Sequence, residues 1–233
     1  MTQHAIVDSE TWIEARKVLL EEEKVLTKAR EALAEKRRQL PWTLVAKPYE
    51  FEGESGTCSL SDLFGDNSQL IVQHFMFGPD WEEGCPSCSF MADGYSQLQP
   101  HLDARDVTMV AVSRAPLPKL LAYRKRLGWS FPWVSSLGSD FNFDFNVSFE
   151  NEAQENGTAV YNYGPMTSSS EEMPGISVFI KDADGSIFHT YSCYARGLDE
   201  FIGTYRFLDA APKGRDESEL SFPMAWVKRS DQY

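Results

Sequence analysis

Two cysteines have the spacing that thiol–disulfide chemistry requires. They stand in the segment Cys85-Pro86-Ser87-Cys88, which follows an apolar run at 70–77 and precedes an apolar-periodic segment at 90–98. A helix that begins at the first cysteine exposes that sulfur to unpaired backbone N–H groups, which favour its thiolate form. The second sulfur then lies one turn further along, close enough to form a disulfide with the first. The segment therefore predicts a reversible redox pair at a strand-to-helix junction.

We expect Cys85 to be the nucleophile and Cys88 the resolving thiol. A thiolate, rather than a thiol, attacks a disulfide, and Cys88 would then attack the mixed disulfide and release the reduced product. Asp80, Glu82 and Glu83 lie close by in the sequence and repel a thiolate, so a modest lowering of the Cys85 pKa is expected. The pair needs no cofactor. Its substrate is expected to be a protein or a small molecule that carries a disulfide.

A metal site on the same two cysteines is an alternative, and an inert structural pair is a third. A metal needs two more ligands, and the sequence has neither a second Cys-x-x-Cys nor a His-x₃₋₅-His pattern. Only the fold can bring together the remaining candidates, which are Cys58, His74, His189 and Cys193. We expect no metal, a buried structural role for His74, and buried, apolar behaviour for Cys58 and Cys193.

Composition limits the class of protein. The chain has 233 residues, of which 42% are hydrophobic, so it can bury a substantial core as one domain with additions or as two small ones. Its net charge of −13 argues against a nucleic-acid-binding surface, because neutralising phosphates requires a basic face. Neither a secretory leader nor a run long enough to span a membrane is visible. We therefore expect a cytoplasmic protein with no membrane partner.

The first forty residues predict a helical extension. Residues 9–39 form one amphipathic pattern whose apolar stripe repeats every seven residues at Trp12, Leu19, Leu26 and Leu33. Asp8, Ser9 and Thr11 are candidate caps for its start. The stripe either packs on the protein's own domain or forms a homodimer with a second copy. Both interpretations remain open.

The rest of the chain predicts an α/β fold. Strands are expected at 70–77 and 107–112, helices from the cysteines to about residue 101 and at 118–127, a hairpin at 176–191 and a closing helix at 199–208. This order resembles the thioredoxin fold, a mixed central sheet with helices on both faces. We assign it to residues 41–210. An aromatic-rich insertion is expected at about 129–174 and a polar tail at 211–233.

Several other residues are candidates for the site. Trp129 and Trp133 belong either to the core or to the wall of an apolar pocket beside the sulfurs. Arg196 either recognises a carboxylate with its two-pronged guanidinium or forms an ordinary ion pair. Asp144 is a candidate proton acceptor for the buried thiol.

Longer strings of residues carry a family resemblance. They are Cys85-Pro86-Ser87-Cys88, Trp129 to Trp133 with Phe141-Asn142-Phe143-Asp144, Gly175-Ile176-Ser177-Val178-Phe179, and Tyr191-Ser192-Cys193-Tyr194-Ala195-Arg196-Gly197. Together they resemble a bacterial thioredoxin-like family of unknown function, over nearly the whole chain. The resemblance implies a thioredoxin-like fold with disulfide-reductase or related redox activity, and it implies no particular substrate.

The chain departs from thioredoxins at two places that touch the substrate. Thioredoxins carry a tryptophan directly before the first cysteine, whereas here Gly84 stands there and Trp81 lies four residues before Cys85. Thioredoxins also carry a cis-proline opposite the disulfide. That place falls near Ile176, with Pro174 two residues earlier, and a trans bond is expected. By this resemblance Trp81 and Ile176 are candidate substrate-binding residues.

Two further interpretations follow from these departures. The peroxiredoxin pattern Pro-x-x-x-Thr/Ser-x-x-Cys fails, because the position three before Cys85 is Glu82, so dithiol exchange ranks above peroxidase activity. The missing proline and tryptophan also leave open a module without enzymatic activity, which would bind a ligand or a second copy of the chain. A dithiol–disulfide oxidoreductase is the leading hypothesis.

Overall fold

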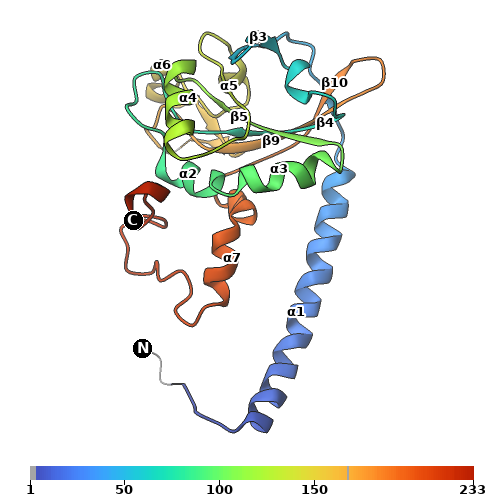
Figure 1. The fold of residues 1–233 in the computed structure, drawn as a ribbon, viewed down its shortest axis with the longest axis vertical. Helices are drawn as coiled ribbons and strands as arrows, with labels where there is room; N and C mark the ends of the chain where they lie inside the picture. Colours follow the sequence, from blue (N-terminus) through green and yellow to red (C-terminus); the bar gives the residue numbers. More distant parts are fainter. Residues whose placement is uncertain (1–3, 167) are drawn as a thin grey trace. The chain divides into compact units, whose positions relative to one another are not determined.

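The computed structural model describes residues 4–166 and 168–233. The chain forms two compact units, divided between Pro41 and Trp42, and each is described by itself (Figure 1).

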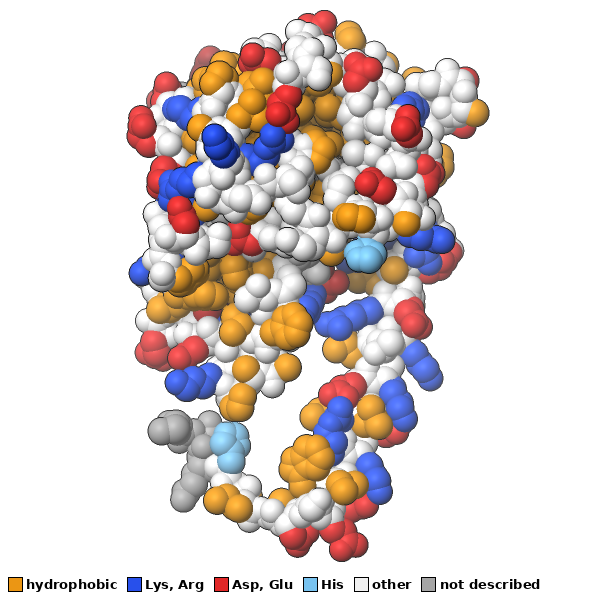
Figure 2. Space-filling model, viewed as in Figure 1, with side chains coloured by type: hydrophobic (Ala, Val, Ile, Leu, Met, Phe, Trp, Pro, Cys, Tyr) orange, Lys and Arg blue, Asp and Glu red, His pale blue; other side chains and the backbone are white. Residues whose placement is uncertain are grey.

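The first unit is the long helix α1 (Ser9–Arg38), one residue shorter than the predicted range. Asp8 caps it, since its carboxylate accepts a hydrogen bond from the backbone N–H of Thr11 at 2.8 Å. No residue of α1 is buried, and the predicted stripe from Trp12 to Leu33 is exposed. Figure 2 shows apolar side chains along this helix, set among charged ones.

The second unit contains a mixed eight-stranded sheet within the described residues, in the order β1-β10-β9-β4-β5-β6-β2-β3. Strands β4, β5 and β6 are parallel, β9 is antiparallel to β4, and β10 is antiparallel to β9. The strands are β1 (Thr43–Leu44), β2 (Glu50–Gly53), β3 (Gly56–Ser59), β4 (Gln69–His74), β5 (Val107–Ser113), β6 (Trp133–Ser135), β9 (Gly175–Lys181) and β10 (Ile187–Tyr194). This confirms the predicted α/β, thioredoxin-like architecture with a central mixed sheet.

Side chains of the inner strands alternate between two cores, as the two-residue period of a strand requires. Leu70, Val72 and Val110 enter one core, which the short helices η1 (Asp62–Phe64) and α5 (Phe141–Asp144) and strand β2 cover. Met109 and Ile176 face the other core. Three helices, α2 (Pro86–Ala92), α4 (Leu117–Arg126) and α7 (Gly203–Ala210), pack against that second core.

Several predicted boundaries are corrected. The helix after the cysteines is two helices, α2 and α3 (Tyr95–Asp103), which part at Asp93 and Gly94. Asp93 accepts hydrogen bonds from Trp129 Nε1 at 3.0 Å and Ser230 Oγ at 3.1 Å. The predicted closing helix is a 3₁₀ segment, η2 (Ala195–Phe201), followed by α7.

The aromatic-rich region contributes to the sheet itself. Its strand β6 pairs with β5 on one side and β2 on the other. The polar stretch that follows holds the helix α6 (Asn151–Glu155) and the small hairpin β7 (Val160–Tyr161) and β8 (Gly164–Pro165). A last 3₁₀ turn, η3 (Ser230–Gln232), ends the C-terminal tail.

Candidate active site

The cysteine segment lies where β4 leaves the sheet and α2 begins. After His74 the chain continues beside β5, with Phe75 N donating to Val112 O at 2.9 Å. The loop then returns, and Cys85 N donates to Met76 O at 3.0 Å. Cys85 is the N-cap of α2 and Pro86 its first residue, a position that proline favours because no backbone N–H is needed there. The predicted placement of Cys85 at a helix start is what the structure has.

Gly84 has a packing reason to precede the cysteine. A Cβ atom built on it would lie 2.7 Å from Phe75 Cε1 and 3.3 Å from Tyr123 Cε1, which is too close for any side chain. The backbone of this loop therefore rests directly on two aromatic rings of the core. The tryptophan that thioredoxins place here does not fit.

The two sulfurs have opposite electrostatic environments. Cys88 is 2% exposed and Cys85 is half-buried. The hydrogen bond from the Cys88 thiol, the backbone N–H groups of Cys88 and Ser87 and the charge of Arg229 together outweigh burial and lower the pKa of Cys85 to about 7. The same hydrogen bond and burial raise the pKa of Cys88 well above its ordinary value. Above pH 7 the Cys85 thiolate therefore predominates, and it accepts a hydrogen bond from a Cys88 thiol that stays protonated.

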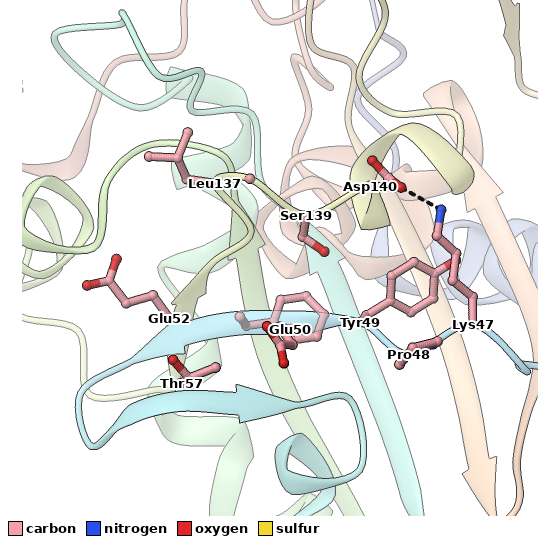
Figure 3. Close-up of a pocket in the computed structure, with 11 residues that line it drawn as sticks. Lys47, Pro48, Tyr49, Glu50, Glu52, Thr57, Leu137, Ser139 and Asp140 are labelled. Carbon is pink, nitrogen blue, oxygen red and sulfur yellow. Dashed lines mark ion pairs between the residues drawn. The ribbon is translucent and has the colours of Figure 1, made fainter.

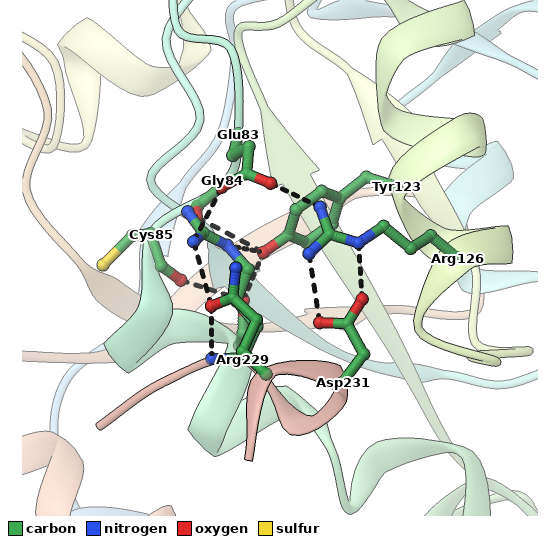
Figure 4. A network of polar contacts seen from close by, with 9 residues as sticks. Glu83, Gly84, Cys85, Tyr123, Arg126, Arg229 and Asp231 are labelled. Carbon is green, nitrogen blue, oxygen red and sulfur yellow. Dashed lines mark hydrogen bonds and ion pairs between the residues drawn. The ribbon is translucent and has the colours of Figure 1, made fainter. Parts of the chain in front are cut away.

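A polar network from the C-terminal tail supports the Cys85 loop (Figure 4). Arg229 Nη2 donates to Gly84 O at 2.8 Å, and its Nε donates to the Tyr123 hydroxyl at 2.7 Å. Ser89 Oγ lies 2.9 Å from that hydroxyl and donates to Cys85 O at 2.9 Å. In Figure 4 the Cys85 sulfur points away from this network, so the network holds the backbone of the loop and does not engage the sulfur.

The same network neutralises the nearest acidic residue. Glu83 forms ion pairs with Arg229, at 2.7 Å, and with Arg126. Arg126 is itself held by Asp231, with Nε to Oδ2 at 2.6 Å. The predicted repulsion between Glu83 and the thiolate is thus offset by two guanidinium groups.

Cys85 and Cys88 line a cavity of about 410 Å³. Met76 and Met91 lie beside the sulfurs, and Met173 and Pro174 come from the segment before β9. The remaining lining comes from two other segments, Ala195, Arg196, Leu198, Asp199 and Ile202 after β10, and Phe222, Pro223 and Met224 in the tail. The sulfurs therefore face an apolar chamber, not a flat surface.

The structure separates the predicted substrate-binding residues. Arg196 lines the cavity, where its guanidinium pairs with Asp199 at 2.8 Å. Trp129, Trp133 and Ile176 are buried in the core shared by α2 and α4 and do not line the cavity, because they face inward from the sheet and its neighbouring loop. Trp81 is half-buried and covers Gly78, away from the cavity.

The structure also tests whether a cis peptide bond lies near Ile176, where thioredoxins have their cis-proline. No peptide bond among the described residues is cis, which confirms the trans bond expected near Ile176. Pro174, two residues earlier, forms part of the cavity wall.

Asp144 does not reach the thiols. It accepts hydrogen bonds from Lys47 Nζ at 2.6 Å and from the Tyr49 hydroxyl at 2.7 Å. Lys47 also pairs with Asp140 at 2.7 Å, beside a separate open pocket of about 380 Å³ that Glu50, Glu52 and Ser139 help to line (Figure 3). Asp144 packs with the other core of the sheet, so the sequence hypothesis of a proton acceptor is wrong.

The scattered metal candidates do not meet. Within the part of the chain that the structure describes, no three His, Cys, Asp or Glu side chains gather as metal ligands. His74 is buried against Phe141 and Phe145, and its Nε2 lies 2.8 Å from Ser177 Oγ, the core histidine expected. Cys58 is half-buried at the other core.

No helix in residues 4–166 and 168–233 has both the length and the apolar character needed to cross a bilayer.

Sequence reasoning missed the contribution of the tail. Arg229 and Tyr123 support the loop, and Phe222 and Met224 close the cavity. Trp226, an aromatic residue in a tail predicted to be polar, was the one local signal. Its ring packs on Phe90 of α2 at 5.4 Å between centroids, which brings the tail to the cysteines.

No curated protein matches the chain. Among solved structures, peroxidoxin BcpB from Mycobacterium tuberculosis is 15% identical, with 72% of this chain and 97% of that one covered at a TM-score of 0.47. Peroxiredoxin Q of Xanthomonas campestris is 14% identical over 73% and 97%, also at 0.47. The mitochondrial 2-Cys peroxiredoxin from Plasmodium falciparum is 12% identical over 71% and 92%, at 0.42.

The family model described as a bacterial protein of unknown function (DUF899) matches residues 1–233, that is, both the helical unit and the unit with the cysteine site. The chain belongs to this family.

Proposed function

We propose that this protein is a thiol–disulfide oxidoreductase in which Cys85 attacks a disulfide and Cys88 resolves the intermediate. One observation carries the proposal. A half-buried sulfur whose pKa is lowered to about 7 faces a cavity and accepts a hydrogen bond from a buried second thiol. Such a pair has the nucleophile, the resolving group and the access that thiol–disulfide exchange needs.

The two cysteines supply both electrons that reduce the substrate disulfide. The Cys85 thiolate attacks one sulfur of the substrate, the substrate S–S bond breaks, and the other sulfur leaves as a thiolate that takes up a proton. Cys88 loses its proton and attacks Cys85, which releases the second thiol and leaves a Cys85–Cys88 disulfide. An external dithiol then reduces this disulfide. A reducing compartment such as the cytoplasm keeps the pair in the state that starts the cycle.

Trapping the mixed disulfide tests the two roles. Cys88→Ser removes the resolving thiol, so exposure to a disulfide is expected to leave one substrate half attached to Cys85, at about one equivalent per chain. Peptide mass spectrometry of the non-reduced protein locates the adduct. Cys58→Ser is the matched control, since Cys58 lies at the other core, and it is expected to turn over substrate without trapping it.

An adduct on Cys58 or Cys193 in place of Cys85 would contradict the assignment. So would a Cys88→Ser variant that keeps full multiple turnover.

We further propose that α1 pairs with α1 of a second copy in an antiparallel arrangement. Its apolar stripe is exposed along its whole length. Residues 9–23 carry five acidic and two basic side chains, whereas residues 24–38 carry six basic and two acidic ones. Antiparallel pairing places each acidic half beside a basic half and buries both stripes.

The mass of the full chain in solution tests this pairing. Light scattering is expected to give twice the chain mass. Leu19→Glu with Leu26→Glu should weaken the dimer by at least about tenfold, because charge replaces apolar contact. Thr27→Glu, on the same helix but off the stripe, is the control. A single-chain mass at all concentrations would rule the pairing out.

A further inference from the structure

We propose that the substrate of Cys85 is a low-molecular-weight disulfide with an apolar, uncharged body, bound in the 410 Å³ cavity whose outer wall is the C-terminal tail. This inference rests on the proposed function and names the substrate class for the same site. It is carried by the lining of the cavity, by the way the tail is fixed, and by the charge at the rim.

The lining suits an apolar body of variable shape. Four methionines, Met76, Met91, Met173 and Met224, surround the space next to the sulfurs. Methionine side chains are flexible and polarisable, so they adapt to irregular apolar groups. Leu198, Ile202 and Phe222 extend the apolar wall. A hydrocarbon substituent on the disulfide would be desolvated by the same surface that receives its sulfur.

The tail wall is anchored before Phe222. Glu217 Oε1 accepts hydrogen bonds from the Tyr205 hydroxyl at 2.9 Å, from Trp226 Nε1 at 2.7 Å and from Met224 N at 3.1 Å. Arg215 adds ion pairs to Asp199 and Asp209, each at 2.7 Å.

The tail wall is also anchored beyond Met224. Arg229 joins the tail to the Gly84 carbonyl and to Glu83, next to Cys85 itself. Because Phe222, Pro223 and Met224 lie between two sets of polar contacts, the cavity is built into the fold. A preformed apolar site of a few hundred Å³ is the size that small-molecule ligands occupy.

The charged side chains at the rim of the cavity are already paired with one another. Arg196 is neutralised by Asp199, which also pairs with Arg215. A strongly charged disulfide would gain little from this balanced pair and would lose hydration on entering the apolar chamber. A protein disulfide would have to bring its polypeptide backbone into a cavity of about 410 Å³ that Phe222, Pro223 and Met224 help to line.

The reaction in the cavity follows the steps given above. The Cys85 thiolate breaks the ligand S–S bond and Cys88 displaces the bound sulfur. A linear disulfide then leaves as two thiols, and a cyclic one such as lipoamide leaves as one dithiol. The two electrons come from the cysteine pair, which a dithiol reductant such as dithiothreitol restores.

Steady-state reduction of four probes, with dithiothreitol as the reductant, tests the substrate class. The probes are lipoamide as an apolar neutral disulfide, bis(2-hydroxyethyl) disulfide as a polar neutral one, oxidised glutathione as a charged one, and insulin as a protein. We expect kcat/KM for lipoamide to exceed that for each of the others by at least about tenfold.

Two exposed phenylalanines provide matched variants. Phe222→Ser removes part of the cavity wall, and the ratio of kcat/KM for lipoamide to that for bis(2-hydroxyethyl) disulfide should fall about fivefold, mostly through KM. Phe207 lies on α7, is 80% exposed and does not line the cavity, so Phe207→Ser should leave the ratio unchanged. Neither side chain is buried, so both variants are expected to fold.

The outcomes separate the two proposals. If insulin or oxidised glutathione is reduced as efficiently as lipoamide, or if Phe222→Ser leaves the ratio unchanged, the substrate class is wrong while the dithiol mechanism stands. If none of the four disulfides is reduced, the proposed function itself fails.

Discussion

Replacing Cys85 by serine is expected to lower disulfide turnover by at least about a thousandfold, to the uncatalysed background. A serine hydroxyl is not ionised near neutral pH and cannot form the mixed disulfide, so the first step has no nucleophile. Cys88 cannot substitute for it, since its thiol is buried and burial by itself disfavours the thiolate and raises the pKa. The measurement is the rate of disulfide reduction with a dithiol in excess.

The structure also predicts that this variant folds. Cys85 occupies the N-cap of α2, with an extended backbone, and serine is among the residues that helix N-caps prefer. Thermal unfolding of Cys85→Ser should therefore match that of the wild type within a few degrees. A folded Cys85→Ser protein that retains disulfide turnover would contradict the proposed function. Cys58→Ser is again the control, and its turnover is expected to match that of the wild type.

Arg229→Gln is expected to raise the pKa of Cys85 and to slow its alkylation at pH 7 by about threefold to tenfold. In the wild type the positive charge of Arg229 helps to hold this pKa at about 7, and its ion pair with Glu83 offsets a nearby negative charge. The glutamine removes both effects. The measurement is the rate of reaction with iodoacetamide as a function of pH.

The sign of the change follows from which form reacts. The thiolate fraction rises with pH through the pKa, so a raised pKa moves the wild-type midpoint near pH 7 to higher pH. The two rates converge above both midpoints, where Cys85 is fully ionised in each protein. Loss of structure would instead carry the midpoint to that of an ordinary cysteine, because every group that lowers the pKa would be gone.

Arg126→Gln provides the comparison for this prediction. Arg126 also pairs with Glu83, but the Gly84 carbonyl accepts its guanidinium hydrogen bond from Arg229, and Arg229 is the cation among the main causes that lower the pKa of Cys85. Its profile should keep a midpoint close to that of the wild type. If the midpoint of Arg229→Gln stays near pH 7, the tail does not contribute to the lowered pKa of Cys85.

The C-terminal tail thus has two roles in the proposed mechanism. Arg229 contacts the loop that carries Cys85, through Gly84 and Tyr123, and its charge helps to lower the pKa of Cys85. The segment from Phe222 to Met224 closes the cavity that the sulfur faces. The site is therefore assembled from segments of the second unit that lie far apart in the sequence.

Much of the fold follows from patterns that act over a few residues. The apolar runs at 70–77 and 107–112 form the adjacent parallel strands β4 and β5, and the pattern at 9–39 forms α1. Strand and helix periods are properties of local backbone geometry, so the sequence displays them directly. Their ends were harder to place. The break at Gly94 depends on side chains of Trp129 and Ser230 that bind Asp93 from far along the chain.

The sequence by itself determined which residues are candidates for chemistry at the site. Two cysteines three residues apart, after a strand and at a helix start, are the basis of the proposed nucleophile and resolving thiol, because the backbone of one helical turn positions both residues. Only the tertiary structure decided what surrounds them. Arg229 contacts Gly84 across 145 residues of sequence, and Trp129, Trp133 and Ile176, which were candidate substrate-binding residues, turn inward to the core. No local pattern records which distant side chain meets a loop, since that depends on how the whole sheet, its helices and the tail pack together.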